Sequence, residues 1–190
     1  MKCPLLLAWL VMFLVFMPDL ARAQTATCVS HPYEPSAVFL GSFWVDVDFG
    51  GPLNVDDCQA HVEICTWLVS GGQTDFVMNA NSIYFTGECA NVNSETFAGI
   101  METLSHAAVV KGADLDYADC GDTVSVWGTS CADRSGADTT TSFESCNAEM
   151  CQRRYVIVCP PEGGITHQYL DEDNIICLIP GCETGCNDND

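Results

Sequence analysis

Carboxylates are the most abundant groups in this sequence that could do chemistry. The chain carries 26 aspartate and glutamate residues against 6 lysines and arginines, a net charge of −20. Asp114, Asp116, Asp119 and Asp122 lie close together, and calcium takes six to eight oxygen ligands of this type. The spacing lacks the third ligand, the glycine and the final glutamate of a high-affinity calcium loop. We therefore expect weak calcium binding by these aspartates and the acidic surface, and no other cofactor.

The charge also decides which partners the chain can have. A strongly negative surface attracts cations and repels polyanions. We expect calcium, a mineral surface or basic extracellular proteins as partners, and neither nucleic acid nor a membrane.

Histidines and serines raise the question of hydrolase chemistry. The four histidines are His31, His61, His106 and His167, but no Gly-x-Ser-x-Gly or His-Glu-x-x-His sequence accompanies them. Scattered histidines are more often surface or packing residues than catalytic bases. We therefore expect a protein that is not an enzyme, with a secreted hydrolase or inhibitor as the third alternative.

The start of the chain has the pattern of a secretory signal peptide. Lys2 precedes an apolar run from Leu5 to Met17, and the small-x-small sequence Ala21-Arg22-Ala23 follows. The run is shorter than the roughly 20 residues of a transmembrane helix. We predict a signal peptide at 1–23, a cysteine-rich acidic domain at 24–190, and secretion from the cell.

Cysteine usage agrees with an oxidising compartment. Of thirteen cysteines, Cys3 belongs to the predicted leader, and twelve remain. An even number in a secreted chain predicts six disulfides, with the connectivity left open. Zinc is not expected, because no Cys-x2-Cys pair occurs. The predicted disulfide cysteines are Cys28, Cys58, Cys65, Cys89, Cys120, Cys131, Cys146, Cys151, Cys159, Cys177, Cys182 and Cys186.

Two segments have the pattern of helices. Asn54 or Asp56 could cap a helix that runs to Leu68, because Cys58, Val62 and Cys65 would then share one face. A second helix is predicted over 94–110, where apolar residues recur at helical spacing.

The remaining patterned segments predict strands. The first is 36–49, which ends in alternation of apolar and polar residues. Segments 75–78 and 82–86, joined by Asn79-Ala80-Asn81, predict a hairpin. Four short strands are predicted at 123–127, 155–158, 165–170 and 175–179. Residues 133–142 read as an exposed loop, and a sub-boundary could fall near 112–119. The fold class is therefore α+β: a small disulfide-rich extracellular domain with two helices packed on short, mostly antiparallel strands.

Arg153 and Arg154 could form a dibasic processing site. They lie between Cys151 and Cys159, directly before an apolar strand that would resist a protease. We expect surface arginines at the start of a strand instead.

The sequence from Val55 through Cys58 and Cys65 to the predicted hairpin and Cys89 resembles PAN/apple modules. This resemblance covers residues 28–89 and implies a cysteine-bearing helix on a small sheet that binds a protein or a glycan. By composition, the chain is also similar to acidic secreted proteins of mineralised matrices. We predict a non-enzymatic matrix or mineral-associated protein with weak calcium binding, and a soluble PAN/apple-like binding module is the alternative.

Overall fold

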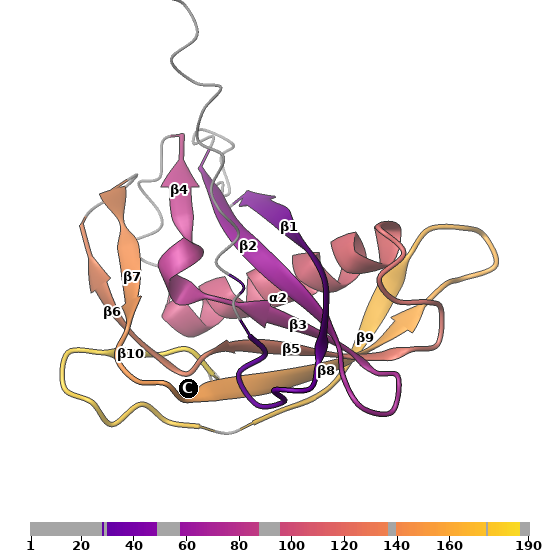
Figure 1. The fold of residues 1–190 in the computed structure, drawn as a ribbon. Coiled ribbons are helices and arrows are strands. Elements are labelled where there is room, and N and C mark those ends of the chain that lie inside the picture. Colours follow the sequence, from indigo (N-terminus) through magenta and orange to yellow (C-terminus); the bar gives the residue numbers. More distant parts are fainter. Residues whose placement is uncertain are drawn as a thin grey trace, which may run out of the picture.

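The computed structural model of the protein describes residues 28, 30–48, 58–87, 96–136, 140–173 and 175–186. In this part of the chain a large curved sheet carries one α-helix across one face, and a small sheet lies beside one end of it (Figure 1). The large sheet contains β1 (Val38–Asp48), β2 (Gln59–Leu68), β3 (Thr74–Met78), β4 (Tyr84–Thr86), β5 (Thr123–Thr129), β8 (Met150–Val158) and β9 (Thr166–Glu172). The small sheet contains β6 (Cys131–Ser135), β7 (Ser142–Ser145) and β10 (Glu183–Thr184).

The large sheet has the strand order β1-β2-β3-β5-β8-β9. β3 and β4 pair with successive parts of β2, and the 3-10 turn η1 (Ala80–Ser82) separates them. β3 and β5 are parallel, and every other pairing among the described strands is antiparallel, as predicted. The β3–β5 pairing joins strands from either side of residues 112–119.

The predicted fold of two helices on short strands is wrong. The described chain is mostly β-sheet with one α-helix, α2 (Phe97–Asp114). The first predicted helix is instead the long strand β2, whose Ala60, Val62 and Ile64 share one face at the two-residue spacing of a strand. Both faces of β2 are covered, and a run buried on both sides cannot be told from a helix by periodicity alone. The helix implied by the PAN/apple resemblance is therefore not formed by residues 59–68.

The predicted hairpin is also wrong. Its two segments do form β3 and β4, but each pairs with β2 and neither pairs with the other. The Asn79 side chain accepts a hydrogen bond from the backbone N–H of Asn81, which caps η1 and keeps the chain running along β2. The same asparagines that suggested a hairpin turn therefore form a break within one strand edge.

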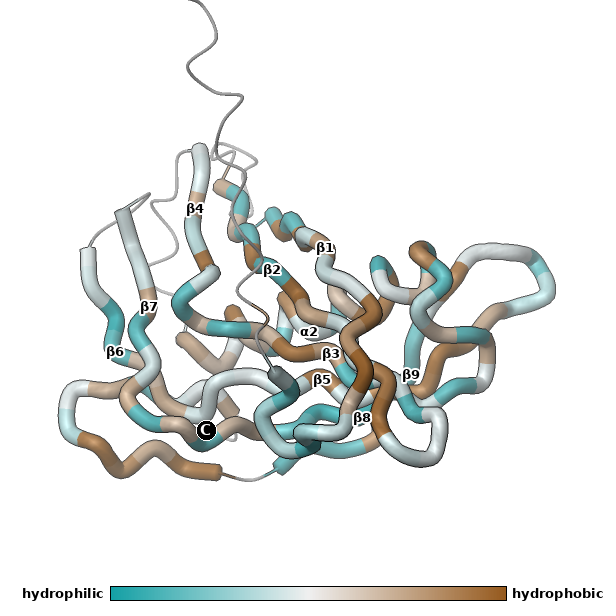
Figure 2. The backbone as a smooth tube through the Cα atoms, in the orientation of Figure 1, coloured by the Kyte–Doolittle hydropathy of each residue, from teal (hydrophilic) through white to brown (hydrophobic). Residues whose placement is uncertain are grey.

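Helix α2 forms the core against one face of the large sheet, which we call the helix face. Thr96 caps its first turn by accepting from the backbone N–H of Gly99. Its buried apolar side chains include Ile100, Met101 and Leu104, and Figure 2 shows the apolar segments of the inner strands beside it. At Gly112 a side chain would not fit, because a Cβ atom would lie 2.3 Å from Cζ of Phe76.

Disulfides tie the ends of the described chain to the sheets. The pairs are Cys28–Cys65, Cys120–Cys159, Cys131–Cys177, Cys146–Cys182 and Cys151–Cys186. Cys58 is also disulfide-bonded, and Cys89 lies outside the described residues. The prediction of a disulfide-bonded protein is confirmed for these cysteines. In the described ranges, no helix has the length and apolar character needed to cross a bilayer.

The expectation that both arginines lie at the surface is wrong for Arg153. Successive residues of a strand point to opposite faces. Arg153 points to the helix face and is only 1% exposed, whereas the side chain of Arg154 is about half exposed.

The later segments differ from prediction as well. The expected loop at 133–142 contributes to β6 and β7, and residues 175–179 are not a strand. The latter segment exposes Ile176 and Leu178 and is anchored by the disulfides of Cys177 and Cys182. It appears as an apolar stretch at the lower left of Figure 2.

Candidate ligand-binding face

The face of the large sheet opposite α2, which we call the outer face, carries the first candidate site. A short N-terminal segment, residues 30–37, packs against it and is anchored by the Cys28–Cys65 disulfide. The His31 ring contacts Trp67 and Trp127 edge-on at 6.0 and 6.5 Å between ring centroids. The outer face is therefore partly covered by the chain itself.

His31 fixes this segment through a buried hydrogen-bond network. Its Nδ1 accepts from the backbone N–H groups of Tyr33 and Glu34 at 3.2 and 2.8 Å. The remaining ring nitrogen, Nε2, therefore carries the proton and donates to Asp75 Oδ2 at 3.0 Å. Trp127 Nε1 donates to the same oxygen at 2.8 Å. Both ring nitrogens of His31 are occupied, so this histidine is a structural group and not a free base.

Asp75 gives the network a pH dependence. Burial raises the pKa of its carboxyl, although the hydrogen bonds from Trp127 and His31 oppose the shift. A raised pKa in the folded state favours the protonated form, so this contribution to stability is present below the unfolded pKa of about 3.9 and is lost as pH rises through the folded pKa. Asp75→Asn keeps an acceptor oxygen for both donors without carrying a charge.

We therefore expect Asp75→Asn to gain stability relative to the native chain as pH rises from 3 to 7. Urea denaturation of both proteins across this range measures the difference. Asp48→Asn, a change on an exposed part of β1, serves as the control and should show no comparable trend. A constant difference for Asp75→Asn would contradict a raised pKa.

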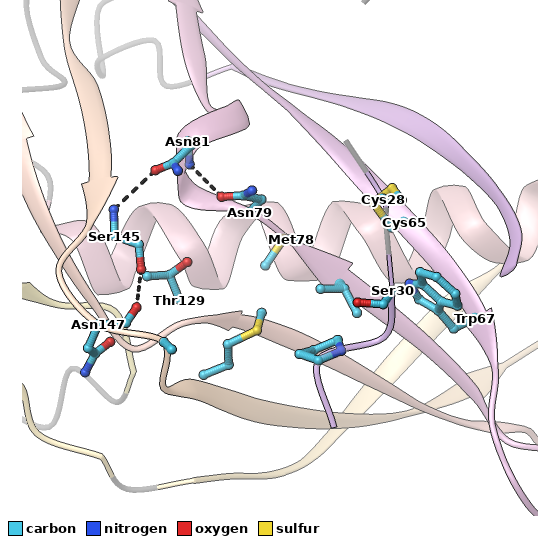
Figure 3. Close-up of a pocket in the computed structure, with 14 residues that line it drawn as sticks. Cys28, Ser30, Cys65, Trp67, Met78, Asn79, Asn81, Thr129, Ser145 and Asn147 are labelled. Carbon is cyan, nitrogen blue, oxygen red and sulfur yellow. Dashed lines mark hydrogen bonds between the residues drawn. A yellow bond between two sulfur atoms is a disulfide. The ribbon is translucent and has the colours of Figure 1, made fainter. Parts of the chain in front are cut away.

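A pocket on the outer face is lined by uncharged residues (Figure 3). It lies between the N-terminal segment, η1 and the loop that follows β7, and its volume is about 300 Å³. We call it the neutral pocket. In a chain with 26 acidic residues, a charge-free lining is the distinguishing property of this site. The described residues that line it are Cys28, Ser30, Pro32, Cys65, Trp67, Val77, Met78, Asn79, Asn81, Thr129, Ser145, Asn147, Ala148 and Met150.

Two asparagines give the neutral pocket oriented donors. The backbone N–H of Asn81 donates to Asn79 Oδ1 at 3.0 Å, and the backbone N–H of Ser145 donates to Asn81 Oδ1 at 3.2 Å. Because a backbone N–H can only donate, each accepting atom must be the amide oxygen. The NH2 group of each side chain is thus left to donate to a ligand (Figure 3).

A second feature of the outer face is an exposed aromatic pair. Trp44 on β1 and Tyr84 on β4 are 36% and 41% exposed, and their rings contact each other at 5.8 Å. Tyr84 also stacks on the His61 ring at 4.7 Å. We call these three residues the aromatic patch. The sequence pointed to alternation in β1, but it did not place Tyr84 beside Trp44, because that contact depends on both strands pairing with β2.

Beside the aromatic patch, His61 bridges a carboxylate and a hydroxyl. Its Nδ1 lies 2.5 Å from Asp46 Oδ1, and its Nε2 lies 2.7 Å from Thr86 Oγ1. This hydrogen-bond order resembles that of hydrolase triads, with threonine in the place of serine. The three residues come from neighbouring strands on one sheet face, where such cross-strand polar contacts also stabilise pairing. The arrangement fixes the Asp46 carboxylate next to the exposed rings.

The four aspartates proposed for calcium lie around the end of α2 and the turn before β5. Asp122 accepts from the backbone N–H of Asp119 at 2.8 Å, and Asp116 has a positive φ of 59°. Within the described ranges, no group of three or more histidine, cysteine, aspartate or glutamate side chains is arranged to hold a metal ion. Weak calcium binding by Asp114, Asp116, Asp119 and Asp122 stays a prediction.

The remaining two histidines meet in space although they are 61 residues apart. His106 on α2 and His167 on β9 are hydrogen-bonded through Nδ1 and Nε2. Helical spacing placed residue 106 on α2, but no sequence pattern could pair it with a residue of the edge strand.

Comparison of the chain with protein-family models, with curated proteins and with solved structures finds no match in any of the three.

Proposed function

We propose that this protein is a secreted extracellular binding module that recognises a neutral glycan on the outer face of its large sheet. The observation that carries the proposal is the neutral pocket, with its uncharged lining and its oriented donors, Asn79 and Asn81. Disulfide bonding supports an extracellular setting, since such bonds persist in oxidising compartments. The binding role is the alternative that the sequence had left open.

The chemistry of the pocket favours a polyhydroxylated ligand. Amide NH2 groups and the hydroxyls of residues such as Thr129 and Ser145 bind sugar hydroxyls without needing charge on either side. A volume of about 300 Å³ is at the lower end of the range for small-molecule sites and suits one or two sugar rings. The net charge of −20 disfavours sulfated or uronic-acid glycans.

The aromatic patch extends the same face with a second kind of contact. Trp44 and Tyr84 offer apolar ring surface together with polar edges, a combination common at binding surfaces. The carboxylate of Asp46 beside them accepts hydrogen bonds from hydroxyl groups. A chain of sugar residues could therefore contact both the patch and the pocket.

Asn79→Asp is expected to weaken binding of a neutral oligosaccharide at least tenfold. The carboxylate still caps η1 through its oxygen, but the donor is gone and a charge enters the neutral pocket. The ligand comes from a glycan array that holds neutral, amino and sulfated saccharides, and titration calorimetry measures its affinity.

Gln168→Glu provides the matched control, because it adds the same charge on an exposed position of β9. It should leave the affinity unchanged. If the array gives no neutral ligand, or if Asn79→Asp binds as well as the native chain while melting at the same temperature, the proposal fails.

A second candidate is the matrix or mineral-associated role with weak calcium binding. The observation that favours it is that three arginines form ion pairs with carboxylates of the same chain: Arg134 with Glu183, Arg153 with Glu172 and Arg154 with Asp171. These arginines neutralise carboxylates locally, and the excess negative charge remains for cations or basic proteins. A ligand that prefers the folded state must raise the melting temperature. An unchanged melting temperature at millimolar calcium would exclude this role.

A further inference from the structure

The pair formed by His106 and His167 lies at an open pocket of about 580 Å³ between α2, β1 and β9. We propose that these two histidines bind a divalent transition-metal ion, of the Cu²⁺ or Zn²⁺ class. The pocket shares no lining residue with the neutral pocket. The two histidines are not among the four aspartates proposed for calcium, although one of these, Asp114, also lies in the pocket wall.

The hydrogen bond within the pair brings one ring nitrogen of each histidine face to face. Nδ1 of His106 faces Nε2 of His167 within hydrogen-bond distance, and Glu102 Oε1 lies 3.5 Å from the other nitrogen of His106, Nε2. A carboxylate beside Nε2 favours the tautomer with its proton there, which leaves a lone pair at Nδ1. Histidines that bind metals commonly have such a carboxylate on their second nitrogen.

A metal ion can replace the single proton that lies between the two rings. The ion takes the lone pair of His106 Nδ1 and that of His167 Nε2, and the proton of His167 moves from Nε2 to Nδ1 of the same ring, so no proton leaves the protein. His167 Nδ1 is buried and has no hydrogen-bond partner among the described residues, so the exchange breaks no hydrogen bond there. Two ligands at 2.0–2.1 Å from zinc are about 3.3 Å apart in tetrahedral geometry, so the rings need to separate slightly.

The surroundings of the pair favour a bound cation. The ring of Tyr155 packs against both histidines. The pocket opens to solvent, and its wall includes Asp46, Asp114 and the positively charged Lys111. Water molecules would complete the coordination.

The other two histidines do not face a second imidazole among the described residues. The ring nitrogens of His31 and of His61 lie within hydrogen-bond distance of carboxylate, hydroxyl or backbone groups instead. Imidazole suits copper and zinc, whereas calcium prefers oxygen ligands. The proposal therefore predicts both which histidines bind and which ions they select.

The test is a titration of the purified full chain with CuCl2 and ZnCl2, followed by calorimetry and by fluorescence of Trp44, which lines the same pocket. We expect Cu²⁺ to bind more tightly than Zn²⁺. His106→Gln and His167→Gln should each weaken binding at least tenfold, whereas His31→Gln, at a histidine outside this pocket, should not change the affinity of the folded protein. Excess CaCl2 should not displace Cu²⁺.

Electron paramagnetic resonance of the Cu²⁺ form gives a readout independent of affinity. The native chain should show two coupled imidazole nitrogens, and each single variant should show one. Native affinity in both His106→Gln and His167→Gln, or a spectrum with no imidazole nitrogen, would overturn the proposal.

Discussion

Arg153→Ala is expected to cost about 3–5 kcal/mol of the free energy of unfolding, the range for breaking a buried ion pair. Nη2 of Arg153 lies 2.6 Å from Glu172 Oε1 and donates to the Gly185 carbonyl at 2.7 Å. The side chain thus joins β8 to β9 and to the C-terminal segment inside the protein. Its removal takes the Arg153 donor from the Gly185 carbonyl and the Arg153 cation from the mostly buried Glu172 carboxylate, and it leaves a cavity.

The neighbouring residue supplies a matched control. Arg154 pairs with Asp171, but both side chains are about half exposed, and exposed pairs contribute about 0–1 kcal/mol. Arg153→Met should cost less than Arg153→Ala, because it fills the space and because Nε and Nη1 of the native side chain have no hydrogen-bond partner among the described residues. Urea denaturation measures the free energy of unfolding of Arg153→Ala, Arg153→Met and Arg154→Ala. Equal losses for Arg153→Ala and Arg154→Ala would contradict the buried position.

Removal of the Cys151–Cys186 disulfide, by changing both cysteines to alanine, is expected to cost more than removal of Cys146–Cys182. The two bonds close loops of nearly equal length, with separations of 35 and 36 residues. Chain entropy alone predicts about 4 kcal/mol for each. Cys151 and Cys186 are fully buried, so their loss also leaves a cavity, whereas Cys146 and Cys182 are partly exposed.

Denaturation of the two double variants under the same oxidising conditions gives this comparison. The loss of loop-closure entropy is nearly the same for both double variants. The difference between their free energies of unfolding therefore measures the buried contact of the C-terminal segment with the sheet. A larger loss for the Cys146–Cys182 pair would show that this segment is not packed as described.

The sequence predicted those elements whose pattern depends on local residues. Alternation in β1 and the helical spacing of apolar residues in α2 identified both elements to within a few residues. β2 was misread because both of its faces are buried, which removes the alternation that marks a strand. The turn at Asn79 was placed well but its role was missed, because pairing of β3 and β4 with β2 depends on distant residues.

The candidate sites were less predictable than the fold. The neutral pocket combines the N-terminal segment, η1 and the loop after β7, and none of its residue types signals a ligand in sequence. In the five disulfides whose two cysteines are both described, the partners are 35 to 46 residues apart, and spacing alone could not select among the pairings. The abundance of acidic residues suggested calcium binding in the sequence. Net charge alone, however, does not show that several carboxylates lie close enough together to bind one ion.

Binding of a neutral saccharide in the neutral pocket is tested most directly by an NMR titration of the ¹⁵N-labelled chain with the best neutral oligosaccharide of the array. We expect the side-chain NH2 signals of Asn79 and Asn81 to shift with ligand concentration. The indole N–H of Trp127, which is hydrogen-bonded to Asp75, should stay in place and so report an unchanged fold. Unshifted asparagine signals at saturating ligand, or shifts confined to other surfaces, would contradict the account.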